Sequence, residues 1–262
     1  MTPEAHAAFT AALVSALATD PDVVGAVLLG SSSGLPPLPD AFSDHDFFVV
    51  TRPGVQERFR TTLGWLPDAA AIALTFRETA HGVKVLYAGG HLAEFAVFDL
   101  DELAVARVNR YRVALDRADV ATRMERVRAA SSAEASAVPD LGWHAGQFLT
   151  ALVVGTGRDA RGERLSGHVF LRCHALRHLL VLLHARLPHD AAARLDNLDP
   201  HRRFELVRPD LGHELEAALR QPAPAAAKAL LDIAVRELPE LLPSPARAAV
   251  GLVLAGDLRS TI

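Results

Sequence analysis

Two apolar runs, one ending in Gly-Ser and the next opening with Asp-x-Asp, constrain the fold more than any other part of this chain. The first run is VLLGSSSG at 27–34, and the second is SDHDFFVV at 43–50. Buried strands are typically short, continuous apolar stretches bounded by turn residues. We therefore expect two neighbouring buried strands whose ends bring small hydroxyl residues close to a pair of carboxylates.

The Asp-x-Asp pair predicts a metal site. Because side chains alternate along a strand, Asp44 and Asp46 are expected on one face and His45 on the other. Two carboxylates on one face repel each other unless a cation lies between them. Oxygen ligands suit hard ions such as Mg²⁺, which keeps several waters and bridges to substrate phosphates. The expected ligand is a nucleotide with its metal, held by Asp44 and Asp46.

The Gly-Ser turn predicts a phosphate contact. Gly30 has no side chain to keep a phosphate away from the backbone, and Ser31 and Ser32 offer hydroxyl and amide donors. These three are the predicted nucleotide-binding residues. The loop that follows contains three prolines between 36 and 39, and proline has no amide to offer a phosphate.

A third carboxylate follows on a later strand. Residues 83–87 and 92–98 read as two strands joined by a Gly-Gly turn, which is a strong hairpin signal. Glu94 shares its face with apolar residues only, where an unpartnered charge would be costly. Two interpretations stay open, a third acid of the site or an ion pair with Lys84 across the hairpin. Lys84 and Arg52 are weak candidates for phosphate contacts.

In this order the motifs resemble the DNA polymerase beta-like nucleotidyltransferases, whose pattern is an apolar residue, Gly-Ser, a loop, Asp-x-Asp and a later acid on another strand. They look closest to the lincosamide and aminoglycoside nucleotidyltransferases that inactivate antibiotics. The resemblance covers the first half of the chain by motif, and the second half matches only as a helical domain. The segments that carry it are Gly30-Ser31, Ser43 to Phe48, His81 to Val85 and Leu92 to Phe95.

The resemblance implies roles for the three acids. Asp44 and Asp46 would carry the metal, with two Mg²⁺ ions expected and ATP as the donor substrate. Glu94 would be the third catalytic acid, which in the antibiotic-modifying members acts as general base on the acceptor hydroxyl.

The pattern of the whole chain predicts an α+β fold. Strands dominate up to about residue 98, with a helix at 58–66 between them, and helical spacing follows from 101. The small, polar segment 129–139 is typical of a linker or a loosely packed helix end. We expect a catalytic domain at 1–130, with a mixed β-sheet flanked by helices, and a helical acceptor-binding bundle at 131–262. The helices expected in the bundle span 143–154, 168–187, 213–219, 225–238 and 244–258.

Composition favours a cytoplasmic enzyme with a small-molecule acceptor. The first hundred residues hold 5 basic and 11 acidic residues, against 22 and 20 in the rest. An acidic catalytic half disfavours nucleic acid and suits a cationic small molecule. The single cysteine, Cys173, excludes an internal disulfide. The N-terminus reads as a helix capped at Thr2 rather than as a signal peptide, and no apolar run is long enough to span a bilayer.

Two features of the second half admit a functional or a structural interpretation. Arg172 and His178 have the spacing of a ribonuclease pair, but the same helix is so rich in arginine and histidine that this spacing has little weight. The polar loop 196–203 could contact an acceptor, although capping and surface charge are the commoner roles of such loops. The scattered histidines lack a compact ligand spacing, and we assign no zinc site.

The sequence thus predicts a metal-dependent enzyme that transfers a nucleoside monophosphate, AMP from ATP, to a hydroxyl of a small molecule and releases pyrophosphate. The acceptor pocket is expected between two domains or between two subunits, so a homodimer remains an open arrangement. Three alternatives stay open: an adenylyltransferase that acts on a protein, as antitoxins do, a non-catalytic nucleotide-binding module, and an RNA-acting enzyme.

Overall fold

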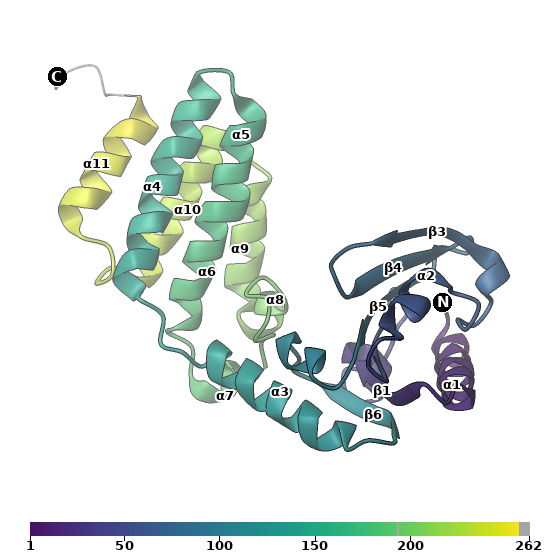
Figure 1. The fold of residues 1–262 in the computed structure, drawn as a ribbon. Coiled ribbons are helices and arrows are strands. Elements are labelled where there is room, and N and C mark those ends of the chain that lie inside the picture. The colour runs from purple at the N-terminus through teal and green to yellow at the C-terminus, as the bar shows by residue number, and fades with distance from the viewer. Residues whose placement is uncertain (193, 257–262) are drawn as a thin grey trace. The chain divides into compact units, whose positions relative to one another are not determined.

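The computed structural model describes residues 1–192 and 194–256, which form two compact units (Figure 1). The first unit comprises Met1–Ser136 and the second begins at Ala137. The first is built on a six-stranded sheet and the second is helical. The predicted α+β class, with a mixed sheet followed by a helical bundle, is confirmed. Residues 129–135, in the segment predicted to be a linker or a loosely packed helix end, are the end of a helix.

The sheet is mixed. Its strands lie in the order β3-β4-β5-β2-β1-β6, and β2 and β5 are parallel while every other neighbouring pair is antiparallel. The predicted neighbours β1 and β2 and the predicted hairpin of β4 and β5 are both present. The strands are β1 (Val23–Leu29), β2 (His45–Thr51), β3 (Ile72–Arg77), β4 (Gly82–Tyr87), β5 (Leu92–Phe98) and β6 (Tyr111–Asp116).

Helices α1 (Pro3–Thr19) and α2 (Gln56–Thr61) cover one face of this sheet. The helix α1 begins as predicted, since the Thr2 hydroxyl accepts a hydrogen bond from the backbone of Ala5. Phe9 of α1 and Phe59 of α2 join the apolar side chains of the strands in one core cluster. This core holds the sheet from the side opposite to the Asp-x-Asp carboxylates.

The other face of the sheet is covered over part of its area. The 3-10 turn Glu102–Val105 and helix α3 (Val120–Ala135) pack on it through a second core that includes Leu103 and Met124. That core meets the strands at Phe48 and Phe98. The carboxylate of Asp46, two residues before Phe48, lies beyond it on the same face.

Two predicted boundaries in the first unit are wrong. The helix expected at 58–66 ends at Thr61, because Thr62 adopts an extended backbone and a Gly and a Pro follow within five residues. The segment after 101, expected to be helical, contains strand β6. Its side chains are half-buried or exposed at the sheet edge, so the alternating pattern of a buried strand is weak, and pairing with β1 decides its conformation.

The second unit is a helical bundle around one apolar core, as predicted. The helix expected at 168–187 is longer at its start, ends at His184 and contains a π-helical turn at Phe170–Ala175. The helix expected to end at Leu258 ends at Ala255, and Leu258 lies outside the described residues. The α-helices are α4 (Leu141–Ala160), α5 (Arg164–Val169), α6 (Leu176–His184), α7 (His189–Ala192), α8 (Phe204–Val207), α9 (Pro209–Leu219), α10 (Ala223–Glu237) and α11 (Ser244–Ala255).

Glycine allows two helices of this bundle to pack closely. A Cβ atom added to Gly167 of α5 would lie 2.9 Å from the carbonyl oxygen of Gly155 on α4. In the part of the chain that the structure describes, no helix is both long enough and apolar enough to cross a membrane.

Candidate active site

Asp46 and Glu94 lie side by side on the sheet. They are register partners across the parallel strands β2 and β5. Partners in register on adjacent strands are about 5 Å apart at Cα and point to the same face. The apolar partners Phe47 and Phe95, one residue further along each strand, point into the core on the other face. The strand register therefore places the second and third acids of the predicted site on one face.

Asp44 lies immediately before β2, where two elements hold its backbone. The carbonyl oxygen of Asp44 accepts hydrogen bonds from Nε2 of His6 at 3.0 Å and from the hydroxyl of Ser32 at 3.5 Å. Asp44 is half-buried, as is Asp46. Helix α1 and the Gly-Ser turn thus together position the backbone that carries the Asp44 carboxylate.

His45, between the two carboxylates, points to the opposite face as predicted. It is buried, its Nδ1 lies 2.9 Å from Nε2 of His91, and its Nε2 lies 2.9 Å from the Thr10 hydroxyl. Burial, together with the neighbouring His6 and His91, lowers the pKa of His45 to about 3. His45 is therefore a neutral structural residue of β2 that contacts α1 and the turn before β5.

The predicted Gly-Ser turn lies against the Asp46 carboxylate. Residues Gly30–Ser33 form a 3-10 turn, and Gly30 has a φ of +51°, in the left-handed region. A Cβ atom added to Gly30 would lie 3.7 Å from Oδ2 of Asp46. The hydroxyl of Ser33 donates to the carbonyl of Gly30 at 2.7 Å and fixes the turn. A phosphate at this turn would meet backbone, not a side chain.

A cavity of about 670 Å³ opens at the same turn. Its polar side chains include Ser31, Ser32 and the β6 residue Arg112, and α1 lines it with polar and apolar residues alike. Asp44, Asp46 and Glu94 do not line this cavity. The Nε of Arg112 donates to the carbonyl of Ser33 at 2.8 Å. The volume lies within the range of small-molecule sites. Arg112 was missed by the sequence analysis because β6 was not recognised as a strand.

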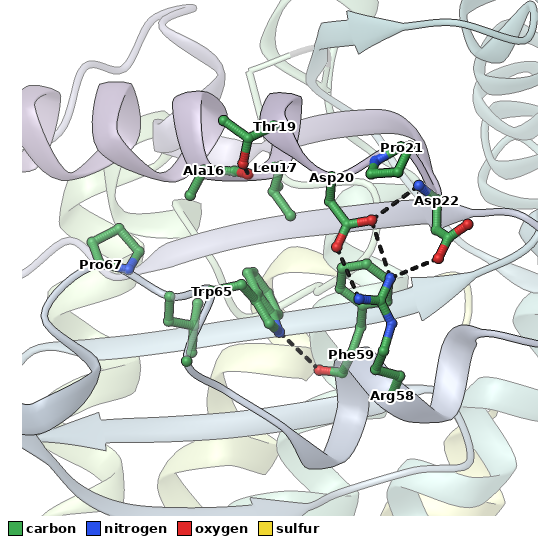
Figure 2. A pocket seen from close by; sticks show the side chains of 12 residues that line it. Ala16, Leu17, Thr19, Asp20, Pro21, Asp22, Arg58, Phe59, Trp65 and Pro67 are labelled. Carbon is green, nitrogen blue, oxygen red and sulfur yellow. Dashed lines mark hydrogen bonds and ion pairs between the residues drawn. The ribbon is translucent and has the colours of Figure 1, made fainter.

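A second cavity, of about 550 Å³, lies at the other end of α1 (Figure 2). Arg58 pairs there with Asp20 at 3.0 Å and with Asp22 at 2.9 Å, and Trp65 donates to the carbonyl of Phe59. The hydrogen bond from Arg58 lowers the pKa of Asp20. None of the predicted site residues lines this cavity, and its charges already pair with one another.

Glu94 is engaged by Lys84. The Lys84 ammonium lies 3.2 Å from Oε1 of Glu94 and 2.9 Å from Oε1 of Glu78, and hydrogen bonds to these carboxylates raise the pKa of Lys84. The ion pair considered from the sequence is thus present. The pair places the positive charge of Lys84 next to Glu94, on the sheet face that also carries Asp46. Arg52 is elsewhere, since it follows the far end of β2 and donates to the carbonyl of Pro21.

The carboxylates fit a Mg²⁺ ion that arrives with its nucleotide. Among residues 1–192 and 194–256, no three His, Cys, Asp or Glu side chains are arranged to hold a metal ion by themselves. Mg²⁺, however, usually takes one or two carboxylates and completes its coordination with water and substrate phosphates. Asp44 and Asp46 would supply those oxygen donors, and the Gly30 backbone carries no side chain beside Asp46.

The candidate residues of the second unit do not converge. Arg172 donates to the carbonyl of Gln221 at 3.3 Å, whereas Nδ1 of His178 lies 3.0 Å from Nδ1 of His144. In the loop 196–203, the buried Asp196 pairs with Arg202 at 3.2 Å. These contacts favour the structural interpretation of both features.

Comparison with known proteins finds no matching family model and no matching curated protein. Several solved structures are similar, and two of them are named here. An aminoglycoside 6-adenyltransferase from Bacillus subtilis is 10% identical, with 96% of this chain and 98% of that one covered and a TM-score of 0.34. A nucleotidyltransferase-like protein from Exiguobacterium sibiricum 255-15 is 14% identical, with 95% and 77% covered and a TM-score of 0.35. Both names are those of nucleotidyltransferases.

Proposed function

We propose that this protein is a metal-dependent nucleotidyltransferase that transfers AMP from ATP to a hydroxyl of a small molecule. The observation that carries the proposal is the meeting of Asp46 with Glu94 on one sheet face, with the Gly30 backbone against the Asp46 carboxylate. In the reaction the acceptor oxygen forms a bond to the α-phosphorus, and the bond from that phosphorus to pyrophosphate breaks. This displacement requires the acceptor and the phosphates to be held in line and the charge on the phosphate oxygens to be neutralised.

The triphosphate would lie at the Gly-Ser turn. Gly30 allows close approach of the phosphates, and Ser31 and Ser32 provide hydroxyl and amide donors beside the 670 Å³ cavity. Arg112 lines the same cavity and brings a positive charge that suits an anionic ligand.

Asp44 and Asp46 would hold the metal. When bound, Mg²⁺ neutralises charge on the triphosphate and on the leaving pyrophosphate. The role of the protein is to fix the two carboxylates, through the strand β2 and the hydrogen bonds to the Asp44 carbonyl.

Glu94 would accept the proton of the acceptor hydroxyl. An ionised carboxylate has about four lone-pair positions, so the contact between Lys84 and Oε1 leaves capacity for a hydroxyl donor. Its position beside Asp46 would hold the attacking oxygen near the metal-bound phosphate.

The test is release of pyrophosphate from ATP and Mg²⁺ against a panel of lincosamides and aminoglycosides. We expect acceptor-dependent release that falls by at least about a hundredfold in Asp46→Asn and Glu94→Gln. Glu78→Gln is the matched control, because it removes the other carboxylate partner of Lys84 and leaves the proposed reacting groups in place. Binding of Mg-ATP with no release for any acceptor would overturn the small-molecule proposal and favour a protein acceptor or a binding module.

A further inference from the structure

We propose that Leu74, Phe76 and Leu86 form an apolar ledge that binds the acceptor beside Glu94 and selects amphipathic acceptors, those with an apolar face next to the reacting hydroxyl. The inference rests on the proposed transfer to a small-molecule hydroxyl and adds the chemical class of the acceptor. Leu74 and Phe76 belong to the edge strand β3, and Leu86 belongs to β4.

Strand register puts the ledge on the face that carries the carboxylates. Residues directly opposite each other on adjacent strands point the same way. Two parallel rows of side chains therefore run across the sheet. One row consists of Phe76, Lys84, Glu94 and Asp46, and the other consists of Leu74, Leu86 and Leu92.

The burial of the intervening residues agrees with this assignment. Val83, Val85 and Tyr87 alternate with Lys84 and Leu86 along β4, and all three are buried in the core beneath α1 and α2. The ledge therefore faces away from that core. The second core, beneath α3, includes none of the three ledge residues.

All three side chains of the ledge expose apolar surface to solvent. Leu74 is 52% exposed, Phe76 49% and Leu86 38%. Single exposed apolar residues are ordinary, but three at neighbouring positions on two paired strands form a patch of the kind that marks binding sites. Edge strands are usually protected by charges or prolines, and β3 has its one charged residue, Arg77, at its last position.

The dimensions suit a small acceptor. Neighbouring strands lie about 4.8 Å apart, and residues two positions apart on a strand lie about 7 Å apart. A hydroxyl at Glu94 would thus lie about 8 Å from Leu86, on the next strand, and about 10 Å from Phe76, two strands away. A molecule of the size of one substituted sugar ring spans these distances.

The charges along the row favour an amphipathic molecule over a polycation. Lys84 stands between Phe76 and Glu94, and its charge is matched by Glu78 and Glu94. A polycationic acceptor would meet this ammonium and an apolar surface at the same place. An acceptor with one polar and one apolar face would place its hydroxyl at Glu94 and its apolar part on the ledge.

The test measures binding of n-hexyl and methyl glucoside to the whole protein by saturation-transfer NMR, separately from turnover. We expect the hexyl compound to bind at least about tenfold more tightly, since burial of each methylene contributes. The preference should disappear in Leu74→Thr and Leu86→Thr, because threonine is polar and still suits a strand. Val105→Thr, which changes another exposed apolar residue of the same unit, should leave the preference unchanged. Thermal unfolding would identify a variant that does not fold, and Leu86→Met should retain the preference.

Two results would overturn the ledge. One is an equal affinity for both glucosides in the unaltered protein, or a hexyl preference that persists in both threonine variants. The other is a change in oligomeric state by light scattering, with glucoside binding unaltered, which would make this face a contact between copies of the chain. The Asp46→Asn variant should keep the hexyl preference and lose pyrophosphate release. A preference without any release would point to failure of the proposed transfer, whereas release without a preference would point to failure of the ledge alone.

Discussion

His6, in the first helix, donates a hydrogen bond from Nε2 to the backbone carbonyl of Asp44 across 3.0 Å. The imidazole is buried and stacks on His45, with 3.7 Å between the ring centroids. A residue near the N-terminus thus positions the backbone of a proposed metal ligand 38 residues later. The bond links the packing of α1 on the sheet to the geometry of the site.

Replacing His6 should therefore impair Mg²⁺ use as well as stability. In His6→Leu the Asp44 carbonyl loses a buried donor, which costs about 1–3 kcal/mol of unfolding free energy. We expect the Mg²⁺ concentration at half-maximal pyrophosphate release to rise several-fold. His6→Gln, which retains an N–H donor on a side chain of similar length, should recover part of both effects. An unchanged Mg²⁺ dependence in a destabilised His6→Leu would restrict His6 to a structural role.

This contact also marks where prediction from the sequence stops. Side-chain alternation in β2 and the hairpin of β4 and β5 could be predicted because both are local patterns, whereas the meeting of Asp46 with Glu94 depends on the parallel pairing of β2 with β5, which neither pattern specifies. The partner of His6 is the backbone carbonyl of residue 44, which every residue type would offer, so the sequence does not indicate this contact. Arg112 was missed for a related reason, since β6 owes its conformation to pairing with β1 more than to its own apolar pattern.

The buried His45 should make the protein less stable in mild acid. Its pKa falls from 6.5 to about 3 in the folded state, so below pH 6.5 the unfolded chain binds a proton that the folded chain does not. This contribution leaves stability unaffected above pH 6.5 and removes roughly 1.4 kcal/mol per pH unit as the pH falls from 6.5 toward 3. Urea unfolding between pH 7.5 and about 4.5 would measure the slope.

The control for this slope is the exposed His213 of α9. His45→Asn should flatten the dependence of the unfolding free energy on pH, while His213→Asn should leave it as it is. The pKa of His91 is also lowered by burial, so some dependence of the same sign should remain in His45→Asn. A slope equal in all three proteins would contradict the assignment to His45.

The ion pair of Lys84 and Glu94 should contribute little to stability. Both side chains keep contact with solvent, at 25% and 31% exposure, and pairs of this kind are worth about 0.2–1 kcal/mol. A double-mutant cycle of Lys84→Met and Glu94→Gln, followed by urea unfolding, measures the coupling free energy directly. A coupling above about 3 kcal/mol is typical of a buried pair. That result would contradict the role of Glu94 as general base and would favour a structural ion pair with Lys84.

Gly30 and Gly54 separate the conformational role of glycine from its proposed role at the phosphate. Both have positive φ, +51° and +84°, so alanine at either position should cost about 1–2 kcal/mol of unfolding free energy. The alanine methyl group at 30 would lie 3.7 Å from Oδ2 of Asp46, whereas at 54 it would meet nothing within 4 Å. We expect Gly30→Ala to weaken binding of fluorescent ATP with Mg²⁺ by at least about tenfold, and Gly54→Ala to bind as the unaltered protein does. Equal ATP affinities in the two variants, at matched stability, would contradict binding of the phosphates at the Gly-Ser turn.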